Sequence, residues 1–282
     1  MNAKQHMKHY LNALLLELKH LIQVLRFKPN DQTRIHHLRL ILKRLQSFTV
    51  LLNLLGAKKI RLSKPLKKVF IVAGKVRDLD LQLGLGPKIS AVFWREHMLP
   101  LWRLRIENAL NRFLRVLKQL SFRHVKRFLQ RLKCRVRKLD KKQIFVQMVI
   151  LIRQKLGEIS ESPILSADKA LHKLRTKLKR VQYWLEFLVK TLKAGSPYLE
   201  VCQTLKELTE NLGQWHDRAA LIQQMDKQQN EIGREQHHCS EKAHNQWQAN
   251  TIVNGLQAQI GLLVTALKAE AHHFEQGEKS YV

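Results

Sequence analysis

The sequence predicts an all-α protein made of two related halves, and three observations lead to this prediction. Of its 282 residues only 11 are Gly and 6 are Pro, while Leu and other helix-forming residues are abundant, a composition that favours long helices with few turns. Apolar residues recur at helical spacing, as they do from Leu11 to Leu25. Two segments of the first half also align with two segments of the second half. We therefore expect two tandem four-helix-type bundles related by pseudo-twofold symmetry, the first in residues 1–140 and the second in residues 141–282.

Breaks containing Gly, Pro, Ser, Asn or Asp divide the first half into helices. Lys28-Pro29-Asn30-Asp31 ends the first helix, and Asn30 or Asp31 can cap the next one. Gly56 ends the second helix, and Pro65 suits the first turn of the third. Gly84-Leu85-Gly86-Pro87 is expected to end the third helix at about Leu83. These breaks predict a first helix over residues 4–26 and a second from the cap at Asn30 or Asp31 to about Leu55. Three further helices are expected over about 63–83, 89–119 and 121–139.

The second half shows the same pattern of helices and breaks. A helix over about 141–157 ends at Gly157, and the segment 160–166 is a break. A helix over about 167–193 ends at Gly195-Ser196-Pro197, and another covers about 198–226. The remainder, to about residue 275, is expected to be helical and more polar.

Net charge is the feature of composition that points to a partner. The chain carries 51 Lys and Arg against 22 Asp and Glu, which gives +29. Residues 1–140 hold 32 of the basic and 7 of the acidic residues, so the first half carries +25 and the second half +4. A charge of this size opposes folding by self-repulsion, which a polyanionic partner would relieve. Nucleic acid, an anionic membrane surface and a non-nucleotide polyphosphate are the candidate partners, and the alternative is a charge that only keeps the protein soluble.

The internal repeat consists of two blocks. Residues 35–46 align with residues 171–182 at an offset of 136. At an offset of 139, Leu66-Lys67 aligns with Leu205-Lys206, and residues 74–78 align with residues 213–217. The three-residue difference between the offsets is an ordinary loop insertion. We infer that both halves contain the same helical unit.

On a helix, the first block separates into an apolar face and a cationic face. The apolar face carries Ile35, Leu38, Leu42, Leu45 and Thr49 in the first copy and Leu171, Leu174, Leu178 and Val181 in the second. The opposite face carries His36, Arg39, Lys43 and Gln46, with Arg44 at its edge, and in the second copy His172, Arg175, Lys179 and Gln182. Cations three or four residues apart are neighbours on a helix and repel each other. Because Arg, Lys and His all donate hydrogen bonds to phosphate oxygens, two such stripes indicate a site for a linear polyanion.

These blocks resemble the CHAD family, whose name stands for a conserved histidine α-helical domain. The pattern HxxRxxxKR occurs in both halves, GKVRDLDL (Gly74–Leu81) is similar to the family's LGxxRDxD segment, and LGQWHD (Leu212–Asp217) is a weaker second copy. The resemblance covers about residues 4–275 and implies the two-bundle fold. It also implies binding of inorganic polyphosphate on basic patches, without catalysis, and targeting to polyphosphate granules. We expect a stand-alone member, because no triphosphate-tunnel domain precedes these residues.

The resemblance also implies roles for particular residues. It assigns polyphosphate binding to His36, Arg39, Lys43, Arg44, Lys67 and Arg77 in the first half and to His172, Arg175, Lys179, Arg180 and Lys206 in the second. Asp78, Asp80 and Asp217 are expected to pair with basic side chains and orient them. The second copy has His216 and Ala219 at the positions of Arg77 and Asp80 in the first. We therefore expect the first-half surface to contribute most to binding.

Two further interpretations stay open at this stage. Nucleic-acid binding by the same basic surface is the alternative function, although the sequence contains no recognised DNA- or RNA-binding motif and its five Trp are scattered at core spacing. The segment 103–142 holds 15 Lys and Arg, with only Glu107 and Asp140 as acidic residues. It is either a second phosphate-binding track or a solvated face.

The sequence gives no support for catalysis, a metal or a cofactor. It contains no phosphate-binding glycine loop, GxSxG turn, HExxH motif or carboxylate pair. His237-His238-Cys239 with His244, and His272-His273, match no standard zinc spacing. Cys134, Cys202 and Cys239 form no CxxC pair, and no apolar run is long enough to span a bilayer. We expect a non-catalytic cytoplasmic protein with no transmembrane segment, and leave its oligomeric state open.

Overall fold

The protein is described by a computed structural model that covers residues 3–56, 59–139, 144–161, 168–191, 198–231, 243–251, 255 and 259–265. These residues form helices and no strand, which confirms the all-α prediction. The first half contains α1 (Ala3–Phe27), α2 (Gln32–Leu54), α3 (Lys64–Ile89), the short α4 (Ala91–Phe93), a π-helical turn (Trp94–Met98), α5 (Leu99–Gln119) and α6 (Phe122–Lys138). The second half contains α7 (Ile144–Ser160), α8 (Asp168–Thr191) and α9 (Tyr198–Glu231). Residues 243–251 and 259–265 are also helical.

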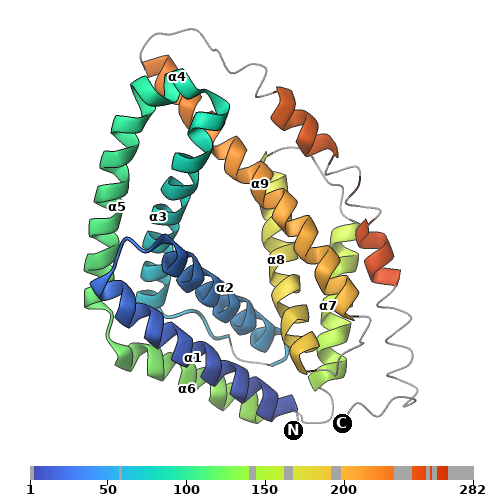
Figure 1. The fold of residues 1–282 in the computed structure, drawn as a ribbon. Coiled ribbons are helices and arrows are strands. Elements are labelled where there is room, and N and C mark those ends of the chain that lie inside the picture. Colours follow the sequence, from blue (N-terminus) through green and yellow to red (C-terminus); the bar gives the residue numbers. More distant parts are fainter. Residues whose placement is uncertain are drawn as a thin grey trace.

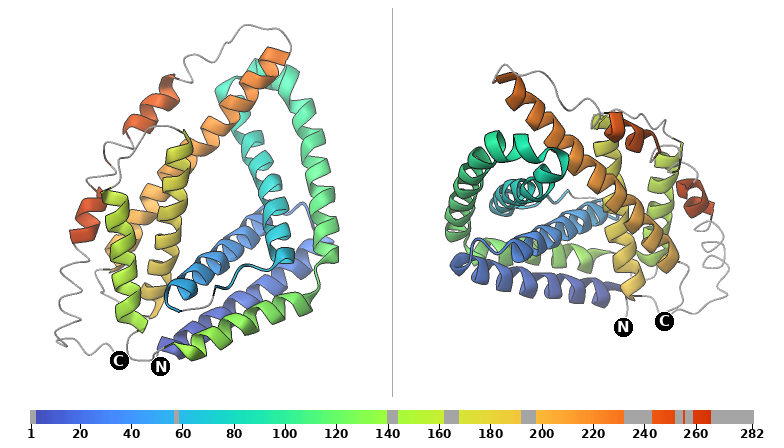
Figure 2. Two further views of the ribbon diagram at one scale, coloured as in Figure 1. Left: turned by 180° about the vertical axis from the view of Figure 1, so that it is seen from behind. Right: turned by 45° about the horizontal axis from the view of Figure 1, so that its top comes forward.

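The helices lie in three groups around a central region (Figure 1). One group is formed by α3 and α5, the second by α1, α2 and α6, and the third by α7, α8 and α9. Contacts of α2 with α8 and of α3 with α9 join the two halves of the chain, as the two views in Figure 2 also show. Consequently α2, α3, α8 and α9 surround the centre of the molecule. The division at residue 140 and the pseudo-twofold relation stay predictions.

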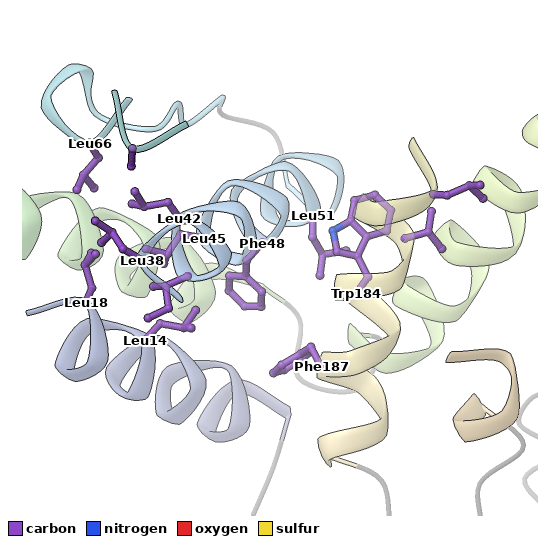
Figure 3. Packing of buried hydrophobic residues seen from close by; sticks show 14 of the residues in the cluster. Leu14, Leu18, Leu38, Leu42, Leu45, Phe48, Leu51, Leu66, Trp184 and Phe187 are labelled. Atoms are coloured by element: carbon purple, nitrogen blue, oxygen red, sulfur yellow. The ribbon is translucent and has the colours of Figure 1, made fainter. Parts of the chain in front are cut away.

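Both halves contribute to one hydrophobic core, which is continuous across the contact of α2 with α8. The rings of Tyr10, Phe48 and Phe187 lie with centroids 5.1–5.4 Å apart. Figure 3 shows Trp184 of α8 in the same region as Phe48 and Phe187. Its indole N–H donates to the backbone carbonyl of Ser47 in α2 at 2.9 Å. This packing fixes how the cationic faces of α2 and α8 lie relative to each other.

Most sequence predictions for α2 agree with the structure. Asp31 rather than Asn30 is the N-cap, and its carboxylate accepts from the backbone N–H of Arg34 at 2.9 Å. All the residues assigned to the two apolar faces are buried, from Ile35 to Thr49 in α2 and from Leu171 to Val181 in α8.

The predicted end of the third helix at Leu83 was wrong, because α3 continues through Gly84, Gly86 and Pro87 to Ile89. Gly86 is buried, and a Cβ atom built on it would overlap the ring of Trp94. The glycine therefore gives space to a tryptophan ring rather than ending the helix. The predicted end at Gly157 was also early, since α7 continues to Ser160.

We expect Gly86→Ala to destabilise the protein by about 3 kcal/mol, at the upper end of the usual cost of overpacking a core. The reason is that Trp94 is only 2% exposed and packs against Trp102 with ring centroids 5.4 Å apart, so the indole has no open space to move into. The measurement is urea unfolding followed by circular dichroism. Gly84→Ala is the matched control, because nothing lies within 4 Å of its Cβ position and alanine favours a helix. An equal loss for both variants would contradict the packing explanation.

Candidate anion-binding site

The two cationic stripes lie on a common cavity of about 640 Å³ at the centre of the molecule. Side chains from α2, α3, α8 and α9 line it. Its basic and histidine side chains are His36, Arg39, Lys43, Lys75, Arg77, His172, Arg175, Lys179, Arg180 and His216, and its carboxylates are Asp78 and Asp217. The neutral lining residues are Gln46, Ser47, Phe70, Leu81, Gln82, Thr176, Tyr183, Ala220 and Gln224. The cavity thus has far more cationic than anionic groups.

Corresponding residues of the two stripes line this cavity from opposite halves of the chain. His36, Arg39 and Lys43 come from α2, and their counterparts His172, Arg175 and Lys179 come from α8. The ammonium of Lys43 lies close enough to Arg175 and Lys179 to be affected by their charge. An anion in the cavity would therefore meet cations of both halves at once.

In each half, a glycine of the second block makes room for an arginine of the first block. A Cβ atom on Gly74 would lie 2.6 Å from Nη1 of Arg39, and a Cβ atom on Gly213 would lie 3.2 Å from Nη2 of Arg175. Each guanidinium therefore crosses the neighbouring helix, α3 or α9, at a position without a side chain. The two glycines are needed for close approach, because neither has a positive φ.

Carboxylates of α3 hold two of the cavity arginines. Nη1 of Arg39 lies 3.4 Å from a carboxylate oxygen of Asp78, and its guanidinium also lies 5.7 Å from the centroid of the Phe70 ring. Nη1 of Arg77 donates to Asp80 at 2.7 Å. Nε of Arg77 and Nε of Arg175 are buried without a hydrogen-bond partner. Each of these two arginines of the cavity wall thus has one donor that the protein itself does not satisfy.

Burial and repulsion lower the pKa values of basic groups in the cavity. Desolvation by burial, followed by the charges of Arg39, Arg175 and Lys179, lowers the pKa of Lys43 to about 8, while Asp78 opposes this effect. Desolvation and then the charge of Arg175 lower the pKa of Lys179. Desolvation also lowers the pKa of His36, with Arg77 as the next cause, so this imidazole is neutral at pH 7. A bound polyanion would offset the repulsion between these cations and so raise their pKa values again.

Burial has the opposite effect on the carboxyl group of Asp217. Desolvation raises its pKa above the usual value, Arg175 lowers it, and the nearby charge of Asp78 raises it. The two aspartates from matched positions of the repeat therefore lie near each other at the wall formed by α3 and α9.

Several residues of the sequence prediction lie outside the cavity lining. Arg44 is paired with Glu186 of α8, with Nη2 3.3 Å from the carboxylate oxygen. Lys67 on α3 and Lys206 on α9 are exposed and do not line the cavity. The prediction that Gln182 faces outward with its stripe was wrong. Gln182 is 3% exposed, and its side-chain oxygen accepts from the Lys179 ammonium at 3.0 Å and from the Thr209 hydroxyl at 2.7 Å.

The structure adds lining residues to those that the sequence singled out. Lys75 and Gln82 lie on the same face of α3 as Asp78, at spacings of three and four residues, and this periodicity could have identified them. Tyr183 of α8 also lines the cavity. No sequence signal marked it, because it lies beside the apolar face of its helix.

The described residues contain no group of three or more His, Cys, Asp or Glu that could hold a metal ion. His237, His238, Cys239, His272 and His273 lie outside the described residues, as do Asp140, Lys141 and Lys142. Of the histidines considered for metal binding, His244 is described and is exposed. Within the described helices, none is long and apolar enough to cross a membrane.

Comparison with known proteins identifies the family. The CHAD domain family model matches residues 11–226. No curated protein matches the chain significantly. Among solved structures, the crystal structure of the CHAD domain from the plant Ricinus communis is similar to this chain with a TM-score of 0.63 and 20% sequence identity, over 95% of this chain and 92% of that one. The family match extends over both stripes and both glycines of the cavity, and the chain belongs to the CHAD domain family.

Proposed function

We propose that the chain binds inorganic polyphosphate in the central cavity, without catalysing a reaction. The observation that supports this most is the meeting of the two stripes, because Arg39, Lys43, Arg175 and Lys179 line one cavity from two helices. A single phosphate ion cannot neutralise so many cations, whereas a linear chain with a charge on every phosphate can. Cytoplasmic location and association with polyphosphate granules belong to the same proposal.

The size of the cavity favours a single linear chain over a nucleic-acid duplex. At about 640 Å³ it lies in the range of pockets that enclose a small ligand. A duplex is wider than a pocket of this size and could contact only its rim. Polyphosphate also lacks bases, so its recognition needs cations and donors but no stacking platform.

The experiment is a pull-down on immobilised long-chain polyphosphate, with shorter polyphosphates, monophosphate and DNA as competitors at equal charge concentration. We expect competition to become stronger with polyphosphate length, since longer chains make more simultaneous contacts. Binding should weaken steeply with salt. Binding to long chains that is no tighter than to an equal concentration of monophosphate would contradict the proposal. Displacement by DNA as effective as by polyphosphate at physiological salt would favour a nucleic-acid ligand instead.

The lowered pKa of Lys43 predicts that polyphosphate affinity falls as the pH rises from 7 to 9. In the free protein this ammonium loses its proton near pH 8. Because a bound polyanion favours the charged form, binding above pH 8 must take up a proton and becomes weaker. Calorimetry in buffers of different ionisation enthalpy should detect this proton uptake, which Lys43→Met should remove.

The lowered pKa of Lys43 also determines how the stability of the free protein changes with pH. The pKa of Lys43 is lower in the folded state than in the unfolded state, so the unfolded chain binds more protons between about pH 8 and 10.5. This group therefore makes the free protein more stable as the pH rises through that window, while polyphosphate binding becomes weaker. A polyphosphate affinity that is constant from pH 7 to 9 would contradict a role for Lys43 in the site.

A further inference from the structure

The helix α6 carries a dense positive charge away from the cavity. Eight of its 17 residues are Lys or Arg and none is acidic, and none of these residues lines the cavity. Its apolar residues are buried in the core, where α6 contacts α1 and α2. Figure 1 shows α6 beside α1 at the periphery of the molecule, whereas α2 lies nearer the centre. Apart from Arg135, whose Nε and Nη2 are buried, the basic side chains of α6 therefore lie on its solvent side, and they play no part in the proposed polyphosphate site.

The basic residues of α6 form two rows on its solvent side. At about 100° per residue, Lys126, Lys133 and Arg137 form a first row, and Arg127, Arg131 and Lys138 form a second row. The centres of the two rows are about 120° apart around the helix axis. All six side chains are exposed except Lys133, which is partly exposed.

A ridge with less charge separates the two rows. It consists of Arg123, Gln130 and Cys134, all of them exposed. Because α6 contains no carboxylate, nothing within the helix neutralises either row one turn away. On α1, the one carboxylate, Glu17, lies 2.6 Å from the His37 imidazole of α2. The positive charge of the two rows is thus not neutralised within α6 or by α1, and the two rows face different directions around the helix axis.

We propose that α6 binds in the major groove of double-stranded DNA. This groove is about 12 Å wide and admits an α-helix, and phosphates line both of its walls. The first and second rows would each face one wall, and the ridge would face the base edges. Over its 17 residues α6 is about 25 Å long, which allows contacts along most of a helical turn of DNA.

Other polyanions fit the two rows less well. A flat membrane surface or a single polyphosphate chain lies on one side of the helix and cannot enclose it as the two walls of a groove do, so it contacts two rows about 120° apart less closely. The buried residues of α6 include its large apolar side chains from Val125 to Val136, so none of these is available to insert into a bilayer. Duplex RNA has a deep and narrow major groove that does not admit a helix.

The test is the binding of a fluorescent duplex of about 20 base pairs, measured by anisotropy over a range of salt concentrations. One variant removes the first row (Lys126→Gln, Lys133→Gln, Arg137→Gln) and a second removes the second row (Arg127→Gln, Arg131→Gln, Lys138→Gln). The matched control removes three exposed lysines of α8 (Lys173→Gln, Lys177→Gln, Lys190→Gln). Each row variant should bind the duplex at least about tenfold more weakly, with a log–log salt slope smaller by about two to three. The control should change the affinity by less than about threefold.

Three results would overturn the proposal. An equal loss in the control would show that net charge alone governs binding. A loss confined to one row would indicate a partner that meets one side of the helix. A row variant that loses binding to long polyphosphate or to vesicles with 30% anionic lipid, but keeps the duplex, would assign α6 to that other partner. The variant Arg39→Gln/Arg175→Gln should keep duplex binding, which separates this test from that of the cavity.

Discussion

Replacing both cavity arginines, in the variant Arg39→Gln/Arg175→Gln, is expected to weaken polyphosphate binding by at least about a hundredfold. Each guanidinium lies against a glycine of the neighbouring helix and lines the cavity from its own half. A hydrogen bond to a charged group contributes about 1.5–3 kcal/mol. Two lost arginines therefore exceed the roughly 2.8 kcal/mol that correspond to a hundredfold change in affinity. Calorimetric titration with polyphosphate of defined length measures the effect.

The matched control for this variant is Lys67→Gln/Lys206→Gln. It also removes one positive charge from each half, at corresponding positions of the repeat, but both lysines are exposed and outside the cavity lining. We expect a loss below about fivefold, from the weaker long-range attraction. If the control lost as much affinity as the arginine variant, polyphosphate would bind on the outer surface rather than in the cavity.

Replacing Trp184 with Ala is expected to have the largest effect on stability, a loss of about 3–5 kcal/mol. Trp184 is 2% exposed and lies at the contact of α2 with α8, where its indole N–H donates to the backbone carbonyl of Ser47. The variant leaves a large hole in the core and removes the hydrogen bond between the Trp184 indole and the Ser47 carbonyl. Chemical unfolding measures the change. Because this contact sets how the two stripes face each other, polyphosphate binding by the remaining folded protein should also weaken.

Trp247→Ala is the control for the tryptophan change. Trp247 is 62% exposed, and surface substitutions usually change stability by less than about 0.5 kcal/mol. A stability loss for Trp184→Ala as small as that for Trp247→Ala would mean that the contact of α2 with α8 does not hold the two halves together.

The sequence predicted local structure well because local structure depends on periodicity. Ile35, Leu38 and Leu42 are three or four residues apart, and this spacing alone indicates a buried face opposite the cations. The alignment of the two blocks singled out Arg39 and Arg175 without any knowledge of where their helices lie. These two residues line the same cavity in the structure.

Features that depend on packing between helices could not be predicted in the same way. Gln182 has the spacing of a stripe residue, but Thr209 of α9 approaches its side chain and the amide is buried. Gly86 lies in a segment with the Gly and Pro residues typical of a helix end, but the absence of a side chain at this position makes room for the ring of Trp94. Likewise, the two cationic stripes line one cavity because Phe48 packs against Phe187, a contact between α2 and α8, which are far apart in the sequence.

The cavity site is tested most directly by a crystal structure of the protein with a short polyphosphate of defined length. We expect density for the chain inside the cavity, with phosphate oxygens within hydrogen-bond distance of the guanidiniums of both Arg39 and Arg175. One bound chain would then contact both halves. A well-ordered polyphosphate bound only to outer surfaces, with no density for it between α2 and α8, would contradict the proposed site.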